Sequence, residues 1–152
     1  MELDALDKRI LRALQRNGRL QNAELAKEVG LSPSPCLRRV RILEKEGIIE
    51  RYAAILDPTK IDQELIIYAK VWLSNQTSEI IERFIYEIKL LPQILECHLM
   101  AGDSDFLLKI VAANLDDYRR FQMGYLAQIE GVYNIKTEIP LQTIKSTTEL
   151  PL

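Results

Sequence analysis

The sequence predicts an α+β protein in two parts, a unit of three short helices followed by a unit in which strands alternate with helices. Apolar residues first recur at the three- and four-residue steps of helices, and the pattern changes after residue 61. Between the two patterns, Asp57-Pro58-Thr59 has the composition of a turn. The 152 residues, 47% of them apolar, can bury one good core or two small ones. We therefore expect domains at 1–60 and 61–152.

Two helices are expected at the start of the first part. The first begins with Asp4 as its N-cap and ends near Gly18. The second begins near Asn22 and ends at Gly30, because glycine readily adopts the left-handed turn on which helices often close. The buried stripe of the first helix is expected to comprise Leu3, Leu6, Ile10 and Leu14.

A third helix is expected from Ser34 to Gly47, with Pro35 at its first position, where a missing N–H costs nothing. Three short helices with tight links have the size and layout of a helix-turn-helix unit. Residues 48–56 are rich in Ile, Tyr and Ala, which predicts an extended strand and linker. The first part is therefore expected to be winged-helix-like.

The second part has the element order βαββαβ, which is the ferredoxin-like split arrangement. One face of such a sheet is covered by helices, and the other carries Tyr68, Trp72 and Met100 among charges. Because that face is too apolar to stay wet as a broad patch, we expect a two-fold homodimer to form through it. Strands are expected at 66–73, 94–101, 105–112 and 132–144, and helices at 78–91 and 116–129.

Several classes of protein are disfavoured by composition. No apolar run is long enough for a transmembrane helix, and the acidic N-terminus is unlike a secretory signal. Cys36 and Cys97 lie far apart and His98 is the only histidine, so we expect reduced thiols and neither a metal nor a cofactor. These observations predict a cytoplasmic protein without a membrane partner.

Charge is distributed unevenly along the chain. Residues 1–60 hold twelve Lys and Arg against nine Asp and Glu, a net charge of +3, whereas residues 61–152 hold eight against thirteen, a net charge of −5. A basic first part and an acidic second part indicate that only the first part approaches a polyanion.

The third helix is apolar on one side and basic on the other. Cys36, Leu37, Val40 and Leu43 fall on one side, and Ser34, Arg38, Arg41 and Lys45 fall opposite. A recognition helix needs such a division, because arginine can bind guanine or phosphate with two hydrogen bonds. The alternative is a solvated basic face on an ordinary helix. Arg51, just beyond, is either a backbone contact or simply exposed. The candidate DNA-binding residues are Ser32, Ser34, Arg38, Arg39, Arg41 and Lys45.

Four segments of the chain resemble the Lrp/AsnC family, also called feast/famine regulatory proteins: Asn22–Ala26, Val29–Val40, Glu96–Leu99 and Gly102–Lys109. The resemblance covers essentially the whole chain. It implies a bacterial or archaeal transcription factor that binds double-stranded DNA through its first domain and is associated with the nucleoid. It further implies dimers that assemble into octamers, with an amino acid bound between dimers as effector.

The turn at Gly102–Phe106 suits an amino-acid site. Glycine permits a close backbone approach, and Asp103 or Asp105 could accept hydrogen bonds from an α-ammonium group while turn amides hold the carboxylate. An ordinary hairpin turn is the alternative, and the resemblance favours the ligand site. The resemblance implies that Thr137–Pro140 forms a wall from a neighbouring subunit. The candidate effector-binding residues are Leu99, Met100, Gly102, Asp103, Ser104, Asp105, Phe106, Thr137 and Ile139.

This sequence departs from the family pattern in the expected effector site and in the third helix. Ser104 stands where the family commonly has an aromatic residue, and Glu138-Ile139-Pro140 stands where it has an apolar β run. Leu99, Met100 and Ile139 suggest an effector the size of leucine or methionine. Arg38 stands where many members have an acidic residue, so the family's operator sequence does not transfer to this chain.

Two other classes of function are the alternatives to a DNA-binding regulator. An enzyme on the βαββαβ unit would need a nucleophile with its base, a phosphate loop or a metal set, and the sequence shows none of these. A metabolite-binding module acting through protein contacts, or an RNA binder, is the other alternative, although the sheet lacks the aromatic pattern that stacks RNA bases. We therefore expect an amino-acid-responsive, DNA-binding transcriptional regulator with no catalytic activity.

Overall fold

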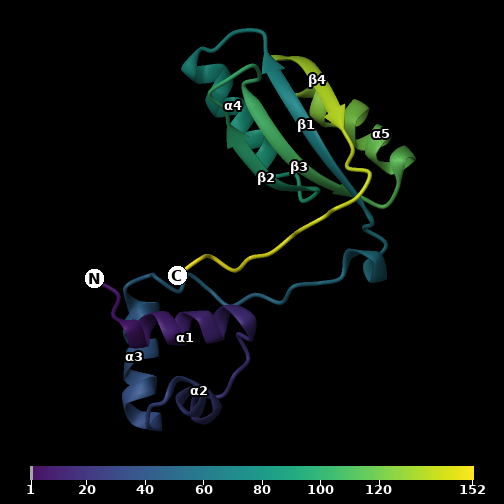
Figure 1. Ribbon diagram of the computed structural model, residues 1–152. Helices are drawn as coiled ribbons and strands as arrows, with labels where there is room; N and C mark the ends of the chain where they lie inside the picture. The colour runs from purple at the N-terminus through teal and green to yellow at the C-terminus, as the bar shows by residue number, and fades with distance from the viewer. Residues whose placement is uncertain (1) are drawn as a thin grey trace. The chain divides into compact units, whose positions relative to one another are not determined.

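The computed structural model describes residues 2–152 and divides the chain into two compact units (Figure 1). The first unit comprises the residues up to Ile55 together with Ile144–Leu152, and the second comprises Leu56–Thr143. The division therefore lies at Ile55 and not after residue 60, and the end of the chain groups with the first unit. The chain consequently passes between the two units twice.

The first unit contains α1 (Ala5–Arg16), α2 (Asn22–Val29) and α3 (Pro33–Lys45). Asp4 caps α1 as predicted. Gly30, in the left-handed conformation at φ 74°, closes α2 as predicted, whereas the N-cap of α2 is Gln21 and not Asn22. The core shared by the three helices comprises Ile10, Leu11, Ala13, Leu25, Ala26, Val29, Cys36 and Leu43.

Helix α3 begins two residues earlier than expected, with Ser32 as its N-cap and Pro33, in place of Pro35, at its first position. Pro33 and Pro35 both lie in the first turn, where a helix leaves backbone N–H groups without partners, so both are tolerated there. The helix ends at Lys45, and Gly47 adopts a left-handed φ of 70° just beyond it.

The strand expected at residues 48–56 is not formed. A strand needs a neighbour for its backbone groups, and the part of the first unit that the structure describes offers no second strand. The end of the chain instead lies against α1: the Gln15 side chain forms two hydrogen bonds with the backbone of Leu150, and Arg12 donates to the carbonyl oxygen of Leu152.

The second unit has the predicted order βαββαβ, with α4 and α5 on one face of a four-stranded antiparallel sheet (Figure 1). The strand order is β2-β3-β1-β4, so β2 and β4 are the edges. Short 3-10 helices lie at Pro58–Ile61 and Leu126–Gln128. The elements are β1 (Leu65–Leu73), α4 (Ser78–Lys89), β2 (Ile94–Leu99), β3 (Phe106–Ala112), α5 (Leu115–Gly124) and β4 (Val132–Glu138).

Strand β4 ends at Glu138 and does not continue to residue 144 as expected. Pro140 follows closely and lacks the N–H that would extend a ladder. The helix expected at 116–129 also divides, because α5 ends at Gly124 and a short 3-10 turn follows.

The core of the second unit lies between the sheet and its two helices. Residues of β1 alternate as predicted, with Ala69 and Val71 buried under the helices and Tyr68 and Trp72 on the other face. Phe84 of α4 packs on Phe106 of β3 with ring centroids 4.5 Å apart. The remaining large buried residues are Ile67, Leu73, Ile88, Leu108, Ile110, Tyr118, Phe121 and Leu126.

Neither a membrane-spanning helix nor a metal-binding cluster occurs within residues 2–152. Over residues 2–152 no helix combines the length and the apolar character needed to cross a membrane. The same residues contain no group of three His, Cys, Asp or Glu side chains arranged to hold a metal ion.

Candidate functional site

Helix α3 presents several basic side chains to solvent. Cys36 and Leu43 are fully buried, which turns the opposite side of the helix outward. Within residues 2–152 no carboxylate pairs with the side chains of Arg38, Arg41 or Lys45. These cations are therefore available to an outside partner. The exposed candidates on this face are Ser32, Ser34, Arg38, Arg41 and Lys45.

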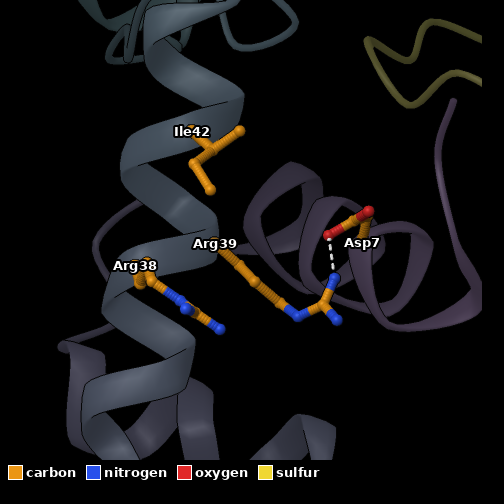
Figure 2. A pocket seen from close by; sticks show the side chains of 4 residues that line it. All are labelled: Asp7, Arg38, Arg39 and Ile42. Carbon is orange, nitrogen blue, oxygen red and sulfur yellow. Dashed lines mark hydrogen bonds and ion pairs between the residues drawn. The ribbon is translucent and has the colours of Figure 1, made fainter. Parts of the chain in front are cut away.

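Arg39 differs from the other candidates, because its guanidinium points toward α1 (Figure 2). Its Nη1 lies 2.7 Å from Asp7 Oδ1 and 2.8 Å from Asp4 Oδ2. These hydrogen bonds raise the pKa of Arg39 above its ordinary value. The pKa of Asp4 is lowered, first by the hydrogen bond from the Asp7 backbone and then by Arg39. Unlike Arg38 and Arg41, Arg39 thus has its charge already paired within the first unit.

Two apolar residues of α3 reach solvent. Leu37, expected on the buried side, is 37% exposed, and Ile42 is 41% exposed. Ile42 lies beside Arg38 along the helix and lines a shallow hollow of about 200 Å³ together with Asp7, Arg38 and Arg39 (Figure 2). The recognition face is thus mixed, with an apolar surface between cations.

The turn between α2 and α3 is held by its own residues. The Nδ2 of Asn22 donates to the carbonyl oxygen of Pro33 at 2.8 Å, which ties the start of α2 to the start of α3. The Oδ1 of the same side chain is buried without a hydrogen-bond partner among the described residues. The backbone N–H of Leu31 returns to the carbonyl of Ala26 at 2.8 Å across the Gly30 turn. These bonds fix where the recognition helix begins.

The second candidate site, the turn between β2 and β3, is braced against the end of β1. Asp105 accepts hydrogen bonds of 2.7 Å from the Leu73 backbone N–H and from Gln76 Nε2. Trp72 Nε1 donates to the Asp103 carbonyl oxygen at 2.7 Å. Each carboxylate oxygen of Asp105 therefore already accepts one hydrogen bond within the chain, and Asp105 supports the turn.

Two further candidates are buried. Phe106 is 1% exposed and stacks on Phe84 within the core, because its place on β3 turns it toward the helices. Ser104 is 6% exposed. Neither side chain can line a pocket on the surface of this chain, so both are corrected from candidate ligand contacts to structural residues.

The exposed part of the turn is small. Leu99 is 66% exposed at the end of β2, Met100 is 40% exposed, and Gly102 and Asp103 are exposed. The Asp103 carboxylate forms no hydrogen bond or ion pair with any described residue, which leaves it free to meet a ligand.

Thr137 and Ile139 do not join this turn within one chain. Leu99 is on edge strand β2 and Thr137 is on edge strand β4, so three strand spacings, about 14 Å, separate them across the sheet. The Thr137 hydroxyl also hydrogen-bonds to Tyr118 at 2.7 Å. The candidate effector residues therefore form two groups.

The uncovered face of the sheet combines ion pairs with apolar side chains. Lys109 Nζ lies 3.0 Å from Glu96 Oε1, and Lys70 Nζ lies 3.5 Å from Glu138 Oε1. Lys109, followed by His98, lowers the pKa of Glu96. The half-buried apolar residues among these charges are Ile66, Tyr68, Trp72, Leu107 and Val111.

Sequence reasoning missed the partners that brace both sites. Arg39 pairs with Asp4 and Asp7. The sequence marks this pairing in only one way, because Asp7 is an acidic residue close to the apolar stripe of α1. Trp72 was assigned to the uncovered face without its link to the turn, and no local pattern marks Gln76. These contacts join residues about thirty positions apart, which a local pattern does not encode.

Both units resemble domains of known proteins. Residues 3–50 match winged helix-turn-helix DNA-binding domains, and residues 66–150 match the Lrp/AsnC ligand binding domain. A helix-turn-helix unit followed by a ligand-binding domain defines a DNA-binding transcriptional regulator. The leucine-responsive regulatory protein of Haemophilus influenzae is 41% identical over 150 residues, which cover 99% of this chain and 90% of that protein. The chain belongs to the Lrp/AsnC family of transcriptional regulators.

Other relatives are also similar over nearly the whole length of the chain. The leucine-responsive regulatory protein of Escherichia coli K12 is 38% identical over 149 residues, covering 98% of this chain and 91% of that protein. A transcriptional regulator of Neisseria meningitidis, crystallised as a complex with L-Met, superimposes with a TM-score of 0.95 at 37% identity, covering 99% of this chain and 97% of that one. An AsnC family regulator of Agrobacterium tumefaciens gives a TM-score of 0.93 at 36% identity, covering 98% and 97%.

Proposed function

We propose that this regulator reads double-stranded DNA with Ser32, Ser34, Arg38, Arg41 and Lys45, and that it does so in the cytoplasm without any catalytic activity. The observation that carries the proposal is the exposed face of α3, whose cations have no carboxylate partner within residues 2–152, while Cys36 and Leu43 bury the opposite side of the helix in the core. Exposed guanidinium groups on a recognition helix can bind phosphates and guanine edges.

The proposal is tested by fluorescence anisotropy with duplexes from the chain's own upstream DNA at several salt concentrations. Replacing Arg41 by Ala should cost about 1–3 kcal/mol if it reads a base. Arg119→Ala is the matched control, because Arg119 is an exposed arginine of α5, outside the first unit. Equal affinity of the wild type and both Arg38→Ala and Arg41→Ala would remove α3 as the DNA-reading element.

We further propose that the effector is an amino acid with the side-chain size of leucine or methionine. Relatives are named leucine-responsive, and one similar structure is a complex with L-Met. The exposed apolar side chains of Leu99 and Met100 could cover such a side chain, while the Asp103 carboxylate accepts from the α-ammonium group. Turn amides at 101–104 would take the carboxylate.

Calorimetry against the twenty amino acids tests this site. Asp103→Asn should abolish binding of the best ligand while leaving the thermal transition unchanged, because its carboxylate supports no described residue. Unchanged binding by Asp103→Asn would exclude it as the ammonium acceptor. Preference for a charged or very small amino acid would exclude the proposed leucine or methionine class.

The assembly we propose is a homodimer formed through the uncovered sheet face, with dimers joining into an octamer so that Thr137 and Ile139 of a neighbouring subunit complete the effector site. The half-buried Tyr68 and Trp72 on that face, and the separation of the two groups of candidate residues within one chain, support it. Sedimentation velocity of wild type and Trp72→Glu tests it, and a wild-type monomer with or without ligand would overturn it.

A further inference from the structure

The contact between α1 and α3 depends on an unusual arrangement of charges. The Asp7 side chain is 5% exposed, although it is a carboxylate, and the Arg39 side chain is 27% exposed. Asp7 Oδ1 receives Arg39 at 2.7 Å while its Oδ2 receives the backbone N–H of Asp4 at 3.2 Å. Both oxygens of the buried carboxylate are thus satisfied, and one of the two bonds comes from the recognition helix.

The acceptors for Arg39 are held in place by α1 itself. Asp4 Oδ1 accepts the backbone N–H of Asp7 at 2.8 Å, which completes a reciprocal capping box. Asp4 Oδ2 then faces Arg39 at 2.8 Å. Two carboxylates are therefore oriented by the helix start, so a single guanidinium can dock on both (Figure 2 shows its bond to Asp7).

Few side chains of α3 pack in the core of the first unit: of its thirteen residues Cys36 and Leu43 are fully buried, and Val40 packs against them partly buried. Each residue advances the helix by about 100°, so Arg38 and Arg41 lie about 100° and 160° around the axis from Arg39 in the same direction, and only about 60° from each other. A contact that fixes the direction of Arg39 therefore also fixes the directions of its exposed neighbours.

We propose that Arg39 is a positioning residue, whose ion pairs with Asp7 and Asp4 set the rotation of α3 so that Arg38 and Arg41 face the DNA. Arg39 itself makes no DNA contact. This inference rests on the proposed reading of DNA by α3. The competing interpretation is that Arg39 leaves the two carboxylates and binds a phosphate.

The two interpretations predict opposite effects for Asp7→Asn. Asparagine keeps the size and one acceptor oxygen but removes the charge that holds Arg39. If Arg39 positions α3, affinity falls by about fivefold or more, the lower limit for losing one arginine contact, even though a negative charge near DNA has been removed. If Arg39 binds phosphate, the same change releases it and DNA binding tightens.

The experiment measures anisotropy of the full chain on its upstream duplex for wild type, Asp7→Asn and Asp4→Asn, with Arg41→Ala as the control for DNA reading. Circular dichroism sets a temperature at which every variant is folded. Should Asp7→Asn fail to fold, Asp4→Asn decides, because Asp4 is half exposed and asparagine is an equally good N-cap. Weaker binding supports the proposal, and unchanged or tighter binding overturns it.

Rescue supplies a second test. Arg39→Met alone should weaken binding in either interpretation, but the double variant Asp7→Leu with Arg39→Met replaces the ion pair by apolar packing. Recovery of affinity in the double variant supports a positioning role, and affinity as low as that of Arg39→Met overturns it. If the wild type itself does not bind DNA, the proposed function fails; if the wild type binds and Arg41→Ala weakens it, only the role of Arg39 is in question.

Discussion

The side-chain amide of Gln15 brackets the backbone of Leu150: its Nε2 donates to the Leu150 carbonyl at 3.1 Å, and its Oε1 accepts the Leu150 N–H at 2.6 Å. One side chain thus satisfies both backbone groups of a residue 135 positions away. Arg12, one turn earlier on α1, adds a bond to Leu152. The end of the chain is therefore tied to the DNA-binding unit after leaving the second unit beyond β4.

Replacing Gln15 by Ala should release the end of the chain. Two exposed hydrogen bonds contribute about 1 kcal/mol each at most, so global unfolding should hardly change while residues 144–152 become mobile. Hydrogen exchange by mass spectrometry should show faster exchange in that segment. Gln142→Ala is the control, because the Gln142 side chain is exposed and makes no hydrogen bond with any described residue. Equal exchange in both variants would show that Gln15 does not hold the tail.

Asp105→Asn should destabilise the second unit. The substitution removes the charge from two hydrogen bonds of 2.7 Å and leaves an amide N–H₂ facing donors, at a cost of about 1–3 kcal/mol. Urea unfolding followed by Trp72 fluorescence measures it, since Trp72 contacts the same turn. Asp103→Asn should unfold like the wild type, and a similar loss in both variants would contradict the difference drawn between them.

Replacing Gly131 by Ala should destabilise the fold. Gly131 has φ 89°, and a Cβ there would lie 2.5 Å from Cγ2 of Ile80 on α4. Strain and overpacking together predict a loss of about 1–3 kcal/mol in the free energy of unfolding. Gly124→Ala is the matched control, because Gly124 ends α5 at an ordinary φ with open space around its Cα. Equal midpoints in thermal unfolding would show that α4 yields to the added methyl group.

The Tyr52 hydroxyl should lose its proton only at a higher pH than an ordinary tyrosine. Burial, together with a 2.9 Å hydrogen bond to Glu44, raises the pKa of Tyr52 to about 12 from its ordinary value of 10.0. Because the folded value is the higher one, the stability it contributes is complete below pH 10 and is lost as the pH rises toward 12. The difference in ultraviolet absorbance between wild type and Tyr52→Phe isolates this phenol, and a midpoint near 10 would contradict the contact with Glu44.

Much of the architecture follows from short-range pattern. Asp4 and Gly30 mark helix ends because capping and left-handed turns are local chemistry. The alternation of Tyr68, Ala69 and Lys70 assigned the two faces of β1 correctly, since neighbouring side chains of a strand point to opposite faces. The exposed arginines of α3 were predicted from helical period alone, and Leu37 shows the limit of that reasoning, because it is on the apolar side and still reaches solvent.

The sequence pattern did not predict which strands and side chains become partners in the folded chain. The strand expected at 48–56 has suitable residues but no neighbour, and β4 stops before Pro140. Phe106 was assigned to a ligand site because it lies in a motif, yet its register on β3 buries it against Phe84. Arg39 has the same side chain as Arg38, and only the fold places Asp7 beside one of them.

The sequence by itself determined the two units, their order of elements, the family and the helix that we propose faces DNA, because caps, periodicity and motif residues act over a few positions. The tertiary structure decided which charges are free. Arg39 is paired and Arg38 is not, and Asp105 is engaged while Asp103 is open, because partners some thirty residues away along the chain lie within hydrogen-bond distance only after folding. The free charges are the ones that we propose bind DNA and effector.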